Sequence, residues 1–193
     1  IGRLVPATNT LTEWHIQSNS SDFTVGNNSG VKDNNRQFGS LNVDSSTGDI
    51  YFIESNSNTI GRLVPATNTL TEWHIQSNTT SIKSLALGFS GSNEMYYVDS
   101  NSNTIGRLAP TTNLITEWNI PTPNSLPTSI KFDRTTGNVY FIESNSNTIG
   151  RLAPFSSEFT EWNVQEKPSD IEVDSAGSIH YIDENGSKIV RLD

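Results

Sequence analysis

The sequence repeats itself, and the length of its repeat limits the folds that it can form. Residues 1–19 recur unchanged as residues 60–78. The triplet Thr-Glu-Trp ends at Trp14, Trp73, Trp118 and Trp162, at intervals of 59, 45 and 44 residues. The motif Ile-Gly-Arg-Leu begins at Ile1, Ile60, Ile105 and Ile149, and a variant of it returns at Ile189. A period of this length is typical of repeat proteins, in which each unit buries its surface against neighbouring units.

Each unit has the pattern of an all-β protein. Residues 129–164 contain four short runs rich in β-branched and aromatic residues, SIKFD, NVYFIE, TIGRLAP and FTEWNV. Turns of Gly, Asn, Ser and Pro separate these runs, and no stretch of ten residues carries the helical apolar period. Four antiparallel strands in a unit of this length form one blade of a β-propeller. We therefore predict a single β-propeller domain over residues 1–193, with blade repeats starting near residues 1, 60, 105 and 149.

The repeat also predicts which strands stand at the two ends. If strands run from A (innermost) to D (outermost), the Ile-Gly-Arg-Leu motif is strand C and Thr-Glu-Trp is strand D. The chain then holds a C–D pair, three complete blades, and strands A, B and C of a last blade. Three arrangements stay open: part of a larger ring, completion by another chain, or a closed four-blade ring with residues 188–193 displaced. An unpaired strand edge is a template for association, so the expected partner is a protein or a second copy at the terminal blade edges.

The blade unit G-x-[IV]-Y-F-I-E-x-N-S-N-x-I-G-R-L-x-P-x-x-x-x-x-T-E-W resembles the blades of streptogramin lyases, the virginiamycin B lyase-like propellers. Residues 48–73, 94–118 and 137–162 carry this motif, and residues 177–192 fit it more loosely. The resemblance implies an elimination that opens a macrocyclic ester by breaking a C–O bond. It also implies a histidine base and Mg²⁺ bound through acidic residues.

In this family the catalytic histidine comes from a Pro-His-Gly-Ile motif on the innermost strand. The corresponding positions are Gly39, Lys83, Thr128 and Ser169, whereas the histidines of this chain are His15, His74 and His180. We therefore assign no catalytic residue and expect a non-catalytic scaffold that binds a partner or assembles edge to edge. Two alternatives stay open: a lyase-like enzyme whose active-site blades lie outside this chain, and a carbohydrate-binding propeller.

Strand alternation places the D–A and B–C loops on one face, which is the predicted ligand face. The B–C loops repeat as Ser-Asn-Ser-Asn and bring Asn56, Asn101 and Asn145 to that face. The first D–A loop contains an insertion at residues 18–37, which is either a partner-binding segment or a solvated loop. Its candidate contact residues are Phe23, Lys32, Asp33 and Arg36. The tryptophans are expected at the outer edge or between blades, with sugar stacking as the alternative.

An acid ends the second strand of each unit, eight residues before an arginine. This spacing favours an ion pair within the hairpin, so we expect no metal site and no cofactor. Ca²⁺ or Mg²⁺ bound by a ring of carboxylates is the alternative. The expected pairs are Glu54 with Arg62, Asp99 with Arg107, Glu143 with Arg151, and Asp183 with Arg191.

Composition narrows the partners and the compartment. A net charge of −9 argues against nucleic acid, and no apolar run is long enough for a membrane span. The chain has no cysteine, so disulfides and thiolate metal sites are excluded. Asn-x-Ser/Thr sequons in predicted loops indicate glycosylation and an extracellular or cell-surface location. They begin at Asn19, Asn27, Asn78 and Asn185.

Overall fold

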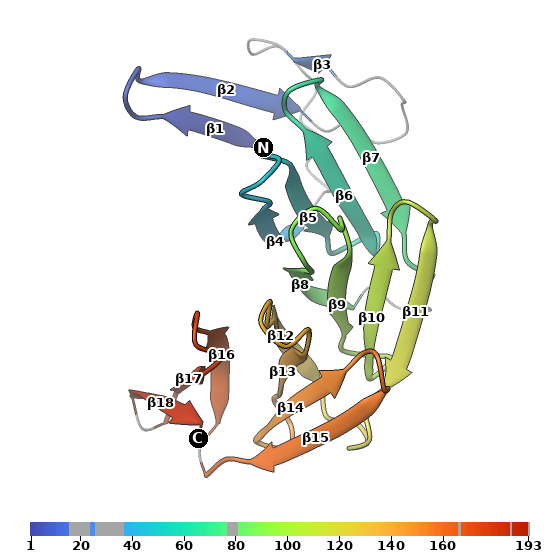
Figure 1. Ribbon diagram of the computed structural model, residues 1–193, viewed down its shortest axis with the longest axis vertical. Coiled ribbons are helices and arrows are strands. Elements are labelled where there is room, and N and C mark those ends of the chain that lie inside the picture. Colours follow the sequence, from blue (N-terminus) through green and yellow to red (C-terminus); the bar gives the residue numbers. More distant parts are fainter. Residues whose placement is uncertain (16–23, 26–36, 77–80, 166, 186, 193) are drawn as a thin grey trace.

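The computed structural model describes residues 1–15, 24–25, 37–76, 81–165, 167–185 and 187–192. All regular elements in these ranges are β-strands, which confirms the predicted all-β class. The strands form separate antiparallel sheets that are arranged in an arc around a common centre (Figure 1). Within the part described, no helix is long and apolar enough to cross a membrane.

Three of the sheets have four strands each, hydrogen-bonded in sequence order, and they are the complete blades that the repeat predicts. Blade 1 contains β4 (Phe38–Val43), β5 (Ile50–Glu54), β6 (Thr59–Val64) and β7 (Thr69–His74). Blade 2 contains β8 (Ile82–Leu87), β9 (Met95–Asp99), β10 (Thr104–Ala109) and β11 (Leu114–Asn119). Blade 3 contains β12 (Pro127–Phe132), β13 (Val139–Glu143), β14 (Thr148–Ala153) and β15 (Glu158–Asn163).

Blade 4 has the predicted strands, and the N-terminal sheet has the predicted pair and one further strand. The N-terminal hairpin, β1 (Gly2–Val5) and β2 (Thr10–His15), corresponds to strands C and D. Blade 4 contains β16 (Pro168–Val173), β17 (Ile179–Asp183) and β18 (Lys188–Leu192), which correspond to strands A, B and C. A short strand within the insertion, β3 (Thr24–Val25), pairs with β2 and was not predicted. Figure 1 shows β4, β8, β12 and β16 innermost in the arc.

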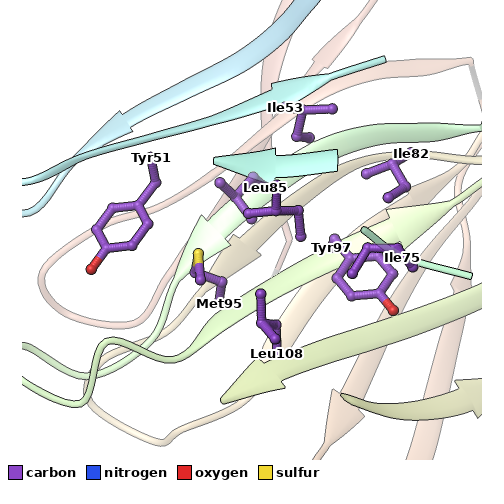
Figure 2. Packing of buried hydrophobic residues seen from close by; sticks show 9 residues of the cluster. Tyr51, Ile53, Ile75, Ile82, Leu85, Met95, Tyr97 and Leu108 are labelled. Carbon is purple, nitrogen blue, oxygen red and sulfur yellow. The ribbon is translucent and has the colours of Figure 1, made fainter. Parts of the chain in front are cut away.

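The hydrophobic core lies between blades, because the B strands bury both of their faces. All five residues of β5 are buried, and the same holds for β9 and β13. Tyr51 and Ile53 of blade 1 pack against Leu85 and Met95 of blade 2 (Figure 2). Alternate residues of β5, such as Phe52, pack instead toward the N-terminal hairpin. Each fully buried side chain of this size contributes about 1.5–3 kcal/mol, so the seams between blades dominate the stability.

A tryptophan hydrogen bond crosses each of the first three seams, from the N-terminal hairpin to blade 3. The indole Nε1 of Trp14 donates to Asn68 Oδ1 of blade 1 at 3.1 Å. Trp73 donates to Asn113 Oδ1 at 2.8 Å, and Trp118 donates to Ser157 Oγ at 3.0 Å. Each acceptor lies in the C–D turn of the following blade. These tryptophans therefore lie between blades, which was one of the two predicted positions.

The glycine of the Ile-Gly-Arg-Leu motif gives room to an aromatic ring. In blade 2 the ring of Tyr97 lies so close to Gly106 that a Cβ added there would overlap the ring carbons. Phe52 covers Gly61, and Phe141 covers Gly150, in the same way. Gly2 has no ring above it, and a Cβ there would meet its nearest atom, Leu11 Cδ1, at 3.7 Å.

This difference predicts opposite outcomes for one substitution at two equivalent glycines. Gly106→Ala should lower the free energy of unfolding by about 1–3 kcal/mol, because the Tyr97 ring must move within a packed seam. Gly2→Ala is the matched control and should change it by less than about 0.5 kcal/mol. Urea unfolding followed by tryptophan fluorescence measures both, and equal effects would contradict the steric explanation.

Candidate functional site

The register of each blade brings four strand ends to one edge. In blade 1, Glu54 at the end of β5 lies opposite Phe38 on one side and Thr59 on the other. Thr59 in turn lies opposite His74, the last residue of β7. The D–A connections therefore emerge beside the B–C turns, as predicted for the ligand face. We call this edge the upper rim, and the edge with the A–B and C–D turns the lower rim.

Every innermost strand is irregular where it meets the upper rim. The register shifts between Phe38 and Leu41 in β4, and between Pro127 and Ile130 in β12. The same irregularity occurs near the start of β8 and of β16. Bulges of this kind re-aim side chains and are common next to binding sites. The residues at these bulges include Gly39, Lys83, Thr128 and Ser169, at which the resemblance expected histidine, together with Ser40, Ser129 and Asp170.

The side chains at these bulges form hydroxyl contacts. Thr128 Oγ1 and Ser144 Oγ lie 2.9 Å apart, which joins β12 to the B–C turn of blade 3. The next residue, Ser129, donates its hydroxyl to Asp170 Oδ1 of blade 4 at 3.0 Å. Lys83 is exposed. The rim therefore presents hydroxyls and an amine near the axis of the arc.

A buried carboxylate ends each B strand just below this rim. The exposed fractions of Glu54, Asp99, Glu143 and Asp183 are 3, 1, 0 and 1%. Asp99 Oδ1 accepts hydrogen bonds from the backbone N–H groups of Asn101 at 3.1 Å and Ser102 at 3.0 Å. In blade 1, Ser57 donates its hydroxyl to Glu54 Oε2 at 3.3 Å. These carboxylates hold the Ser-Asn-Ser-Asn turns in place.

The register contradicts the predicted pairing of each of these acids with the arginine eight residues later. Arg62 lies opposite Tyr51, and Glu54 lies opposite Thr59, three positions along the same strands. Because side chains alternate between faces, an odd offset directs the acid and the arginine to opposite faces of the sheet. Arg107, Arg151 and Arg191 are likewise opposite Tyr96, Tyr140 and His180.

The arginines have other partners. Arg62 makes two hydrogen bonds to Asp49 Oδ2, from Nε at 2.9 Å and from Nη2 at 2.5 Å. Arg107 lies 3.7 Å from Glu94, and Arg151 donates to Thr160 Oγ1 at 2.8 Å. In blade 4, Asp183 has an ion pair with Lys188 at 3.4 Å. Asp49 and Glu94 each precede a B strand by one residue. This position could have identified them as partners of the arginines, but the prediction considered only the acids that lie eight residues before an arginine.

Glu143 is the most perturbed acid of the rim. Burial raises its pKa to about 7, and the nearby negative charge of Glu161 adds to the shift. Its Oε1 is buried and has no hydrogen-bond donor within the part of the chain described. The neutral form of Glu143 is therefore favoured well above the pH at which a solvated glutamate ionises.

Glu161 belongs to β15 and reaches the D–A loop that leads into blade 3. It accepts hydrogen bonds from Thr122, from the hydroxyl at 2.9 Å and from the backbone N–H at 3.3 Å. The equivalent acid of blade 2, Glu117, accepts instead from the hydroxyl of Tyr97 at 2.9 Å. Blade 3 has Phe141 at that position, which leaves its acid free to hold the loop. Sequence analysis missed this pair, although the change from Tyr to Phe was visible.

The three asparagines predicted for the ligand face lie exposed on the upper rim. Asn56 accepts a hydrogen bond from the backbone of Gln37 at 3.3 Å, and Asn145 donates to the Asn124 carbonyl at 3.0 Å. Asn101 is exposed beside the buried Asp99. Asn185, a predicted glycosylation position, is exposed in the B–C turn of blade 4.

Several residues that the sequence singled out lie outside the described part of the chain. Most of the insertion at residues 18–37 lies outside the described residues. This applies to the candidates Phe23, Lys32, Asp33 and Arg36, and to the sequon positions Asn19, Asn27 and Asn78.

The rim carboxylates do not gather into a metal centre. Among the described residues there is no group of three or more His, Asp or Glu side chains that could hold a metal ion. The acids are spread over four blades, and their oxygens serve the turns. The residues described here therefore do not fit the Mg²⁺ site that the resemblance implies.

Four-stranded antiparallel blades around a common centre, with bulged inner strands and a loop-bearing rim, define a β-propeller. Residues 33–193 match the model of the virginiamycin B lyase family. The chain belongs to this family. A search of curated protein sequences gives no match.

Solved structures agree with this assignment. Virginiamycin B lyase from Staphylococcus aureus is 26% identical with a TM-score of 0.73, over 100% of this chain and 59% of that structure. A streptogramin B lyase is 25% identical with a TM-score of 0.74, over 100% of this chain and 57% of its own. A catalytically inactive histidine-to-alanine variant of the Staphylococcus aureus lyase, with quinupristin, is 20% identical with a TM-score of 0.69. That match covers 84% of this chain and 57% of the variant. The chain thus spans less than two thirds of the length of these lyases.

The raised pKa of Glu143 predicts a pH-dependent stability. Because the folded protein holds this proton more tightly than the unfolded chain, the stabilisation is complete below the ordinary glutamate pKa and is lost as the pH rises through about 7. Glu143→Gln mimics the protonated form, so the variant should be more stable than the unmodified protein above pH 7. The difference should vanish near pH 4.

Urea midpoints measured across this pH range test the prediction. Glu158→Gln, at the exposed first residue of β15, is the control and should follow the unmodified protein at every pH. A Glu143→Gln variant whose advantage does not change with pH would show that the carboxyl is ionised in the folded state.

Proposed function

We propose that this chain is a non-catalytic propeller segment that binds a partner at its upper rim and assembles through its end faces. The observation that carries the proposal is the set of residues at the four inner-strand bulges. Gly39, Lys83, Thr128 and Ser169 stand where the family places histidine, so these positions supply no imidazole base. Asp170, also at the bulge of blade 4, accepts the hydroxyl of Ser129. The buried carboxylates below them serve the turns.

The alternative in this family is a C–O elimination that opens a streptogramin ring. Because that reaction needs a positioned base, the chain should produce no linearised quinupristin in the presence of Mg²⁺, with virginiamycin B lyase as the positive control. Mass spectrometry detects the ring-opened product directly. Turnover that His180→Ala or Lys83→Ala abolishes would overturn the proposal and identify the base.

The face of the N-terminal hairpin supports the assembly part of the proposal. Leu4 is 59% exposed, whereas its equivalent in blade 1, Leu63, is fully buried by the hairpin itself. Leu41 of the inner strand is 55% exposed, and its equivalent in blade 3, Ile130, is 1% exposed. A cavity of about 430 Å³ lies between β1 and β4, lined by these two leucines, Ile50 and other residues of both strands.

Blade 4 exposes the complementary half of the same seam. Ile182 and Ile189 are 44% and 76% exposed. Their equivalents in blade 3, Ile142 and Ile149, are fully buried against blade 4. The seams within the chain join these two kinds of face, so the occupant that fits each end is a blade of the same repeat. We assign that blade to a second copy of the chain, packed head to tail.

Light scattering tests this assembly. The chain should have a mass at least twice 21.2 kDa, and Ile189→Asp or Leu11→Asp should return it to 21.2 kDa, because a charge is then buried in the seam. Both positions are exposed within one chain, so folding is preserved. Thr111→Asp, in an exposed C–D turn, is the control. A mass of 21.2 kDa for the unmodified chain at high concentration would contradict self-association.

We place the protein outside the cell or at its surface. The exposed Asn185 in its sequon and the absence of cysteine support this location. Mass spectrometry of the native protein tests it, because a glycan on Asn185 requires passage through a secretory compartment.

A further inference from the structure

Two residues that break the repeat meet at one place on the lower rim. Phe155 occupies the C–D turn of blade 3, where the equivalent turns have Ala7, Ala66 and Thr111. Phe89 occupies the A–B turn of blade 2, where blades 1, 3 and 4 have Ser45, Arg134 and Ser175. Both substitutions place an aromatic ring where the repeat has smaller or polar side chains.

The two rings converge over a single glycine. A Cβ added to Gly137 would meet a ring carbon of Phe155 at 3.2 Å and a ring carbon of Phe89 at 3.2 Å. The corresponding glycines Gly48 and Gly91 have no atom within 4 Å of such a Cβ. The two phenylalanine rings therefore lie beside the same glycine, at the seam between blades 2 and 3.

Phe89 rests on two further rings, the partly buried Phe132 and the buried Tyr96. Phe89 makes an edge-to-face contact with Phe132, with ring centres 4.9 Å apart and an angle of 86° between the planes. Phe132 in turn stacks on Tyr96 at 5.2 Å, and Tyr96 is buried in the seam. The support fixes the ring of Phe89, which is nevertheless 39% exposed, while Phe155 is 85% exposed.

The surface around the two phenylalanine rings carries hydroxyl groups. The residues that adjoin the two phenylalanines and Gly137 in sequence, and that are exposed, include Ser90, Thr135, Thr136 and Ser156. A ligand that fits must offer an apolar C–H face to the rings and hydrogen-bonding groups along its edge. Sugar rings have this combination, because their axial C–H groups carry partial positive charge that the negative ring face attracts.

We propose that Phe89 and Phe155 form a stacking platform for a neutral polysaccharide on the lower rim. The site is separate from the upper rim, and it lies wholly within blades 2 and 3. An apolar protein side chain is the weaker candidate, because hot spots of protein interfaces lie in enclosed and desolvated pockets, and Phe155 is open to solvent on nearly all sides.

Native gel electrophoresis in gels that contain a soluble polysaccharide tests the platform. The panel is hydroxyethylcellulose, laminarin, xyloglucan, galactomannan and arabinoxylan. At least one should retard the unmodified chain. Phe155→Ala should weaken that binding by about two- to tenfold, the effect of losing one aromatic contact. This variant keeps its fold, because the same turn already accepts alanine at Ala66.

A matched control adds one exposed phenylalanine at a turn that has no counterpart of Phe89 beside it. Thr111→Phe places an exposed phenylalanine in the equivalent turn of blade 2, and it should bind as the unmodified chain does. Phe89→Ala, checked for folding by its unfolding midpoint, should weaken binding as Phe155→Ala does. The proposal is overturned if no polysaccharide retards the chain, or if retardation is unchanged in Phe155→Ala. It is also overturned if Phe155→Ala abolishes self-association, since the platform would then be a contact between copies.

Discussion

Both faces of the B strand are buried in every complete blade, and the packing of blade against blade follows from this. Residues such as Tyr51 and Phe52 are neighbours in sequence but are buried against different sheets, one ahead and one behind. A blade of this kind cannot hide its apolar surface alone, so it is stable only between two others. The glycine beneath each ring and the tryptophans across the first three seams meet the same requirement for close contact on both sides.

Burial on both faces also explains why the upper rim does not expose the carboxylates that end the B strands. An acid that ends a B strand lies inside a seam, and it must find hydrogen-bond donors nearby to remain there. Asp99 finds them in its own turn. Burial raises the pKa of Glu143 to about 7 instead, and the nearby charge of Glu161 adds to the shift. Among the described residues of this rim, the exposed asparagines and the residues at the inner-strand bulges are available for contact with other molecules.

The period and the alternation of apolar residues were sufficient to predict the blades, the strand order and the repeat strands of both end sheets. The ion pairs were predicted wrongly, because a fixed spacing along the chain says nothing about register. In the β5–β6 hairpin, partners have numbers that sum to 113, so Arg62 shares a face with Asp49 and not with Glu54. The contact between Glu161 and Thr122 depends on the path of a D–A loop, and these loops vary in sequence among the blades. Such contacts require coordinates, whereas a hairpin register could have been read from the turn.

The hydrogen bonds from the tryptophans all point the same way along the chain, from a D strand to the turn of the blade that follows. Donor and acceptor are thus held by different units, and blades 1 and 2 each supply one donor and one acceptor. When a whole unit is gained or lost, each remaining indole still has an acceptor of the same kind in the next unit. When half a unit is gained or lost, one indole has no acceptor. Genes of this type can therefore lengthen or shorten by unequal recombination between their near-identical copies without damage to the joints. The identity of residues 1–19 and 60–78 is what such a history would leave behind.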